Sequence, residues 1–261
     1  MTEGDARWLR TTDGVDIAAR RRGDLDAPVA LVVAHGFTMH GRDTRLAALA
    51  VDLVHAGRAV YTFDFRGHGH SSGMSTLGDL EILDLDAVVA LARRYGHQRV
   101  VVVGASMGAF VALRHAALLG GVDAVIGVST PARWGVSPRV RARLLLLAAH
   151  NPAGRRILSA LGTNVAGGLS APASPARLAG RITVPVALVH GDRDRYVPIA
   201  DSILLHERLA GPKRLVILPG FGHAESAFTT GFAGVVDSLV DELLMETGPR
   251  DGPGTDANES G

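Results

Sequence analysis

Ser106 is the residue of this 261-residue chain whose setting most clearly indicates chemistry. It stands in Gly104-Ala-Ser106-Met-Gly108, between an apolar run of strand length and a stretch with a helical pattern. So sharp a strand-to-helix turn strains the serine and presents its hydroxyl at a helix N-terminus, where backbone N–H groups favour developing negative charge. The pattern predicts a nucleophile. The alternatives are a glycine-rich turn with an incidental serine and a phosphate-binding turn, but the spacing and lysine of phosphate-binding motifs are absent.

A nucleophilic serine needs a base within hydrogen-bond reach and an acid that orients the base. His223 is favoured among eleven histidines because it ends the glycine-lined sequence Gly-Phe-Gly-His223 after the last expected strand. Active-site loops of open α/β sheets gather at that edge. We expect His35, His68 and His190 to have structural roles, as hydrogen-bonding residues of turns or as a buried strand end.

Two aspartates are candidates for the acid. Asp192 and Asp194 both follow the strand expected at Val184–His190, in one loop. Asp192 has the character of a turn residue that bonds its own backbone. The earlier strand that ends at Val128 is followed by Ser-Thr-Pro and therefore offers no acid.

The elements that position these residues alternate between strands and helices. Two short strands joined by Asp13-Gly14 predict an antiparallel hairpin at the start. Buried apolar runs, separated by helical patterns, then predict six parallel strands with helices on both faces of the sheet. The strands are expected at Trp8–Thr12, Val15–Arg21, Val29–Ala34, Ala59–Phe63, Arg99–Val103, Ala124–Val128, Val184–His190 and Arg214–Leu218. The helices are expected near Leu46–His55, Leu77–Tyr95, Phe110–Leu119, Ile199–Ala210 and Phe228–Glu246.

About fifty residues interrupt this rhythm, and we expect them to form a small cap insertion at about 132–181 within a single domain of residues 1–246. Helices are expected at Val140–Ala149 and Arg155–Leu161, and Ser174-Pro175 marks the start of a third. Basic residues precede the leucine run 144–147 in the first of these helices. We expect those leucines to pack on the core; the alternative is an apolar lid that approaches a lipid surface. Residues 247–261 are polar, rich in Gly and Pro, and expected to be disordered.

Several segments together resemble the α/β-hydrolase fold superfamily, in its serine esterase, lipase and thioesterase branch. The turn around Ser106 is similar to that family's nucleophile elbow, and residues 35–37, 64–73, 191–198 and 220–223 resemble its oxyanion, turn, acid and histidine segments in the family's order. The likeness spans residues from about 29 to 240.

The resemblance assigns roles to individual residues. The order Ser106, Asp194, His223 is the chain order of this fold, and its Gly-x-x-Asp pattern selects Asp194 over Asp192. The backbone N–H groups of Phe37 and Met107 are the implied donors to an oxyanion. No cofactor and no metal are implied.

Composition excludes several partner classes. The net charge is +1 with basic residues spread along the chain, so a nucleic-acid partner is not expected. The chain has no cysteine, hence no disulfide or thiol nucleophile. Its N-terminus lacks a signal-peptide pattern and no apolar run reaches membrane-spanning length, so we expect a cytoplasmic protein without stable membrane insertion. The arginine bias, with a single lysine, suggests a bacterial source.

We therefore predict a serine hydrolase that cleaves a small carboxylic ester or thioester through an acyl-enzyme. Acylglycerol lipases, thioesterases, C–C bond hydrolases and perhydrolases share these residues, so the sequence does not select among them. Dehalogenases and epoxide hydrolases require an aspartate where Ser106 stands. The alternative from another class is a weakly hydrolytic or non-hydrolytic receptor or signalling accessory on the same fold, against which the complete Ser-His-Asp set argues.

Overall fold

The computed structural model describes residues 5–135, 137–224 and 231–246. The hydrophobic runs of the sequence form one eight-stranded sheet with the strand order β1-β2-β4-β3-β5-β6-β7-β8. Its strands are β1 (Asp5–Arg10), β2 (Asp16–Arg22), β3 (Val29–Ala34), β4 (Ala59–Phe63), β5 (Arg99–Ala105), β6 (Ala124–Val128), β7 (Val186–Gly191) and β8 (Lys213–Leu218). Strands β3 to β8 are parallel, while β1 pairs antiparallel with β2 and β2 with β4. This confirms the mostly parallel sheet and the leading hairpin that the sequence predicts.

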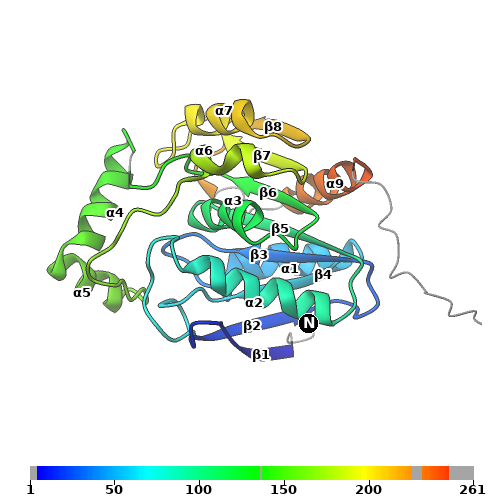
Figure 1. Ribbon diagram of the computed structural model, residues 1–261, viewed down its shortest axis with the longest axis horizontal. Helices are drawn as coiled ribbons and strands as arrows, with labels where there is room; N and C mark the ends of the chain where they lie inside the picture. The colour runs from blue at the N-terminus through cyan, green and yellow to red at the C-terminus, as the bar shows by residue number, and fades with distance from the viewer. Residues whose placement is uncertain (1–4, 136, 225–230, 247–261) are drawn as a thin grey trace, which may run out of the picture.

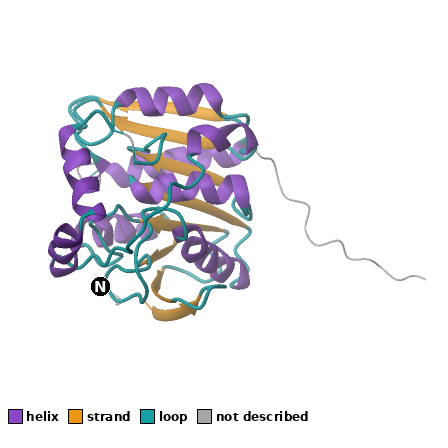
Figure 2. Cartoon of the chain, turned by 60° about the vertical axis from the view of Figure 1, so that its left-hand side comes forward, coloured by secondary structure: helices purple, strands orange, loops and turns teal. Residues whose placement is uncertain are grey.

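Helices cover both faces of the sheet, as Figures 1 and 2 show. The helices are α1 (Thr44–His55), α2 (Glu81–Arg94), α3 (Met107–Leu118), α4 (Val140–His150), α5 (Pro152–Ala160), α6 (Pro175–Leu178), α7 (Ile199–Arg208) and α9 (Phe232–Met245). Buried residues of α2, α3, α6 and α7 form one core with the sheet, and those of α1 and α9 form a second core on the opposite face. The sheet is therefore shielded from water on both sides, which explains its continuous apolar strands.

Three expected helix starts are wrong. Helix α5 begins at Pro152 instead of Arg155, because the Asn151 side chain caps it by accepting the N–H groups of Ala153 and Gly154. Helix α2 begins at Glu81 instead of Leu77, because Leu77 (φ 55°) and Gly78 (φ 98°) have left-handed backbones that a helix excludes. Helix α3 begins at Met107 instead of Phe110, because Ser106 already occupies the N-cap position. Part of the last expected helix, residues 228–230, and the tail from residue 247 lie outside the described residues.

The insertion between β6 and β7 holds α4, α5, α6 and the 3₁₀ turn Ala179–Arg181. Ser174 occupies the N-cap position of α6, but its side chain makes no capping hydrogen bond. Helices α4 and α5 lie together at the left-hand end of the molecule in Figure 1. No helix of the described ranges is long and apolar enough to cross a membrane.

Candidate active site

Ser106 lies at the turn between β5 and α3, and its backbone is strained. Its dihedral angles are φ 51° and ψ −109°, a region that non-glycine residues rarely adopt. Its N–H donates to the Val128 carbonyl at 2.9 Å, and its carbonyl accepts the N–H of Phe110 at 3.0 Å. The surrounding fold thus holds the serine in this conformation.

The glycines beside Ser106 are required by space. A Cβ on Gly104 would lie 2.6 Å from the backbone of Ala109, and one on Gly108 would collide with the Ala34 carbonyl. Strands β5 and β3 and helix α3 therefore approach each other at a distance that only glycine permits.

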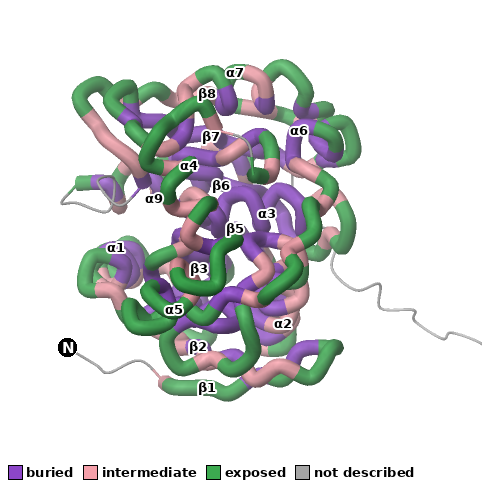
Figure 3. Tube along the Cα trace, turned by 90° about the vertical axis from the view of Figure 1, so that its left-hand side faces the viewer, coloured by how far each residue is buried: buried purple, intermediate pink, exposed green. Residues whose placement is uncertain are grey.

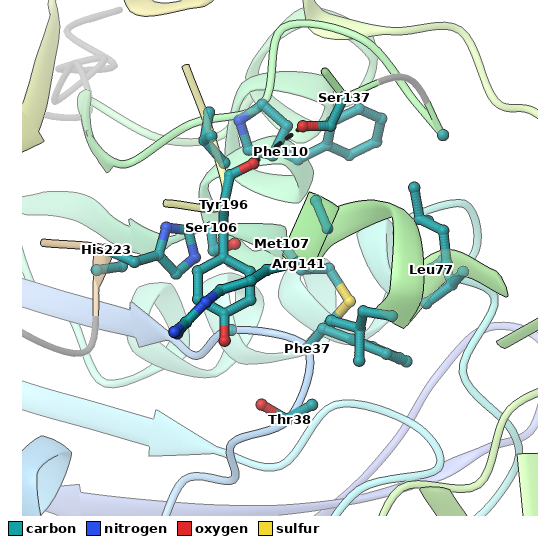
Figure 4. A pocket seen from close by; sticks show the side chains of 18 of the residues that line it. Phe37, Thr38, Leu77, Ser106, Met107, Phe110, Ser137, Arg141, Tyr196 and His223 are labelled. Atoms are coloured by element: carbon teal, nitrogen blue, oxygen red, sulfur yellow. Dashed lines mark hydrogen bonds between the residues drawn. The ribbon is translucent and has the colours of Figure 1, made fainter. Parts of the chain in front are cut away.

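His223 and Asp194, predicted from separate loops, are hydrogen-bonded to each other. His223 Nδ1 lies 2.8 Å from Asp194 Oδ2, and a carboxylate can only accept, so Nδ1 carries the proton. Nε2 is then free of a proton in the neutral ring. Figure 4 shows this ring beside the side chain of Ser106, so that the three predicted residues form one group.

The carboxylate of Asp194 is buried and held in place. Its Oδ1 accepts the backbone N–H groups of Tyr196 at 2.8 Å and Val197 at 2.9 Å. Burial alone would raise the pKa of this carboxyl, but the hydrogen bond and charge of His223 and the two backbone donors outweigh burial and lower it. Asp194 therefore stays ionised and fixes the orientation of the histidine.

Asp192 has a different role. It is exposed, and its Oδ1 accepts the N–H of Gly220 at 2.7 Å. The contact joins the acid loop to the histidine loop, and the geometry accordingly places Asp194, not Asp192, at the histidine ring.

Phe37 and Met107, the expected oxyanion donors, both line the cavity above Ser106. As the first residue of α3, Met107 has an N–H without an acceptor in its own helix. The Phe37 carbonyl lies 2.5 Å from His68 Nε2, a contact that fixes the orientation of this loop. The buried His68 thus has the turn-stabilising role that the sequence predicts.

His35 and His190 are also buried structural residues, as expected. His35 Nε2 accepts the N–H of Phe65 at 3.0 Å, and its Nδ1 donates to the Gly36 carbonyl at 2.8 Å. Burial, together with the nearby His68, holds the pKa of His35 well below 6.5. The ring is therefore neutral, and its two hydrogen bonds join Phe65 to the segment that leads to Phe37.

Ser106 and His223 line a cavity of about 800 Å³. Its walls are largely apolar and come from the loop after β3, helices α3 and α4, and the acid loop; they include Phe37, Met39, Leu77, Met107, Phe110, Trp134, Leu144, Leu145, Leu146 and Tyr196. Arg45, Arg133 and Arg141 also line it, with Asp201 as the acidic side chain among the described lining residues. The described wall is therefore mainly apolar, with more positively than negatively charged side chains.

Tyr196 and Trp134 are parts of the site that the sequence analysis missed. The Tyr196 ring lies 4.9 Å from that of His223, and the Ser137 hydroxyl donates to its carbonyl at 3.0 Å (Figure 4). Trp134 Nε1 donates to the Leu77 carbonyl at 3.0 Å, which ties the insertion to the loop before α2. Both roles depend on contacts between distant segments. Tyr196 belongs to the acid segment 191–198, but the sequence of that segment does not indicate its contact with His223.

The insertion corrects the expectation for its leucines. Leu145 and Leu146 pack against a small core with Leu77, Leu158 and other residues of the cap, whereas Leu144 and Leu147 are 61% and 64% exposed. Only half of the leucine run therefore packs inward. Within the described residues no group of three or more His, Asp or Glu side chains is arranged to hold a metal ion.

Comparison with known proteins agrees with this architecture. Residues 26–158 match the family model described as serine aminopeptidase, S33. The chain is 30% identical over 223 residues to the uncharacterized protein YqkD of Bacillus subtilis, covering 82% of this chain and 70% of YqkD. It is 31% identical over 244 residues to a monoacylglycerol lipase of Mycolicibacterium smegmatis, covering 77% of this chain and 82% of the lipase.

The fold has solved counterparts as well. An esterase of Pyrococcus furiosus superimposes with a TM-score of 0.73 at 23% identity, covering 93% of each chain. On the sequence and family matches, the chain belongs to the serine aminopeptidase S33 family of the α/β-hydrolase superfamily.

Proposed function

We propose that this protein is a serine hydrolase that cleaves a small carboxylic ester or thioester, with Ser106 as nucleophile, His223 as base and Asp194 as the orienting acid. The observation that carries the proposal is the 2.8 Å bond from His223 Nδ1 to the buried Asp194, with the ring beside the strained Ser106. This arrangement matches the roles that acyl transfer requires. Nδ1 of His223 binds Asp194, and Nε2 is available to take a proton.

In the first half-reaction the Ser106 hydroxyl oxygen attacks the substrate carbonyl carbon, and His223 Nε2 takes the hydroxyl proton. The imidazolium that forms is stabilised by the ionised Asp194. Collapse of the tetrahedral intermediate breaks the bond to the alcohol or thiol, which receives the proton from Nε2. An acyl-enzyme remains.

In the second half-reaction water attacks the acyl carbon while His223 Nε2 accepts its proton, and the carboxylic acid leaves Ser106. The backbone N–H groups of Phe37 and Met107 are the proposed donors to the oxyanion in both steps. One such donor contributes about 3 kcal/mol when it is aimed at the developing charge.

The cavity supports the proposal that an apolar acyl group is the part of the substrate that the protein recognises. Its walls are largely apolar, and a monoacylglycerol lipase, which is named for an ester substrate, is among the relatives of this chain. The name of the matching family instead points to peptides with a free N-terminal amine. Three arginines line the cavity, and its described acid, Asp201, accepts the Ala132 N–H and lies near Arg133, so the cavity offers a protonated amine little attraction.

Hydrolysis of p-nitrophenyl esters with increasing acyl length, compared with aminoacyl p-nitroanilides, tests the proposal. We expect turnover of the esters, a burst of p-nitrophenol from the acyl-enzyme, and little release from the anilides. The Ser106→Ala variant should lose the burst. Ester turnover by Ser106→Ala that equals that of the unaltered chain, or a preference for the anilides, would overturn the assignment.

A further inference from the structure

One face of cap helix α4 is apolar although it is exposed to water, and one of its residues, Leu144, also lines the cavity. Val140, Leu144 and Leu147 are 67%, 61% and 64% exposed, and their spacing of four and three residues places them in one stripe. The inner side holds Leu145, Leu146 and the buried Ala149. A surface helix ordinarily turns polar residues outward, so an exposed apolar stripe of this kind indicates that this face of the helix has a partner.

Helix α5, which packs against α4, also presents exposed apolar side chains. Ile157 and Leu161, four residues apart, are 63% and 75% exposed, whereas Leu158 between them is buried. The two helices pack closely, because a Cβ on Gly154 would collide with the backbone of Ala148. Both helices face the viewer in Figure 3, at the end of the molecule that bears the cap.

The charge of the cap is one-sided. Residues 132–181 contain eight of the 27 basic residues of the chain and none of its 26 acidic ones. Arg139, Arg143 and Arg156 are exposed beside the apolar stripe on α4 and α5. A second copy of this chain would bring the same arginines face to face, so self-association through this surface is disfavoured.

We propose that the cap surface formed by Val140, Leu144, Leu147, Ile157 and Leu161 docks on an anionic lipid bilayer. The aliphatic side chains would enter the boundary between headgroups and acyl chains, and the arginines would pair with lipid phosphates. Because α4 also lines the cavity, docking brings the cavity to the lipid surface. The docking itself does not depend on the proposed hydrolase function.

Co-sedimentation with vesicles tests the docking without any turnover. The full chain is mixed with vesicles of phosphatidylcholine alone, or of phosphatidylcholine and phosphatidylglycerol in equal parts. We expect binding to the mixed vesicles that is at least about tenfold tighter than to the neutral ones and weakens as salt screens the arginines. The double variant L147E/I157E, whose residues do not line the cavity, should bind at least about tenfold more weakly.

Leu119→Glu is the matched control, since Leu119 is 47% exposed at the C-terminal end of α3, away from the cap. It should leave vesicle binding unchanged, and circular dichroism with thermal unfolding verifies that each variant is folded. Absence of binding to the mixed vesicles at low salt, or equal binding by the double variant, overturns the proposal. So does self-association of the unaltered chain, measured by sedimentation velocity, that the double variant abolishes.

Discussion

The imidazole of His190 lies against the carboxylate of Asp194, with Nε2 3.6 Å from the oxygen that accepts the His223 bond. The same Nε2 is 3.1 Å from the Val197 carbonyl, and Nδ1 is 2.7 Å from the Ser202 hydroxyl. Burial lowers the pKa of His190, so the ring is neutral: Nε2 donates and Nδ1 accepts. His190 therefore holds the acid loop in place through the Val197 carbonyl.

Replacing His190 should disturb the reaction through Asp194. In His190→Leu the Val197 carbonyl loses its donor, and the loop whose N–H groups hold Asp194 can shift. We expect kcat to fall about ten- to hundredfold with little change in KM, because small displacements of reacting groups have effects of this size. Steady-state kinetics measure both constants; His190→Gln, which can restore a donor, should recover part of kcat. A change confined to KM would contradict a positioning role.

The two aspartates of the acid loop should behave differently. Asp194→Asn removes the ionised acceptor of His223 Nδ1, and kcat should fall roughly 10⁴-fold because the ring loses its tautomer and its charge stabilisation. Asp192→Asn, the matched control, changes only the bond to Gly220 and should retain most activity. Comparable losses in the two variants would show that the orienting acid is misassigned.

Stability should decline with acid partly because of His35. Its pKa lies well below 6.5 in the folded chain, so below pH 6.5 the unfolded chain binds the additional proton. The free energy of unfolding then falls as pH drops below 6.5 and is independent of this group above that value. His190 contributes in the same direction.

Urea unfolding across this pH range measures the effect. His35→Gln should show a shallower decline, whereas His55→Gln, at the exposed end of α1, serves as the control. An unchanged slope in His35→Gln would contradict the assignment.

The hairpin is anchored through Arg66. This guanidinium is 3% exposed and bonds Asp84 of α2 and Asp13 of the hairpin turn, each at 2.7 Å. Arg66→Met removes the guanidinium from the buried Asp84, which keeps the backbone N–H of residue 66 as a donor, and should lower the free energy of unfolding by about 3–5 kcal/mol.

Arg10 provides the comparison, because its ion pair with Asp16 is 68% exposed on the arginine side. Arg10→Met should cost less than about 1 kcal/mol. Equal losses in urea unfolding would refute a special role for the buried network.

The sequence predicts this sheet well for a physical reason. Strands buried on both faces are continuous apolar runs, and β3, β4 and β6 begin and end at the predicted residues. Helix starts are harder, since the left-handed Leu77 is imposed by its surroundings: Glu81 accepts from Ser75, Thr76 and Gly78 and shapes the loop before α2. Gly78 was the local signal for this turn.

The residues of the candidate site also differ in how well local sequence predicts them. Ser106, Asp194 and His223 follow strands in recognisable local patterns, whereas Tyr196 and Trp134 reach the cavity through contacts between segments far apart in the chain. The leucine run of the cap has no helical period, so the sequence could not indicate which leucines face inward. The exposed stripe is a product of tertiary packing.

Labelling with a fluorophosphonate probe, followed by peptide mass spectrometry, tests the central claim most directly. The probe reacts with a serine only where a base activates its hydroxyl. We predict one adduct, on Ser106, that is lost in His223→Ala and absent after denaturation. A folded protein that forms no adduct on Ser106, or that forms it equally in His223→Ala, would contradict the account.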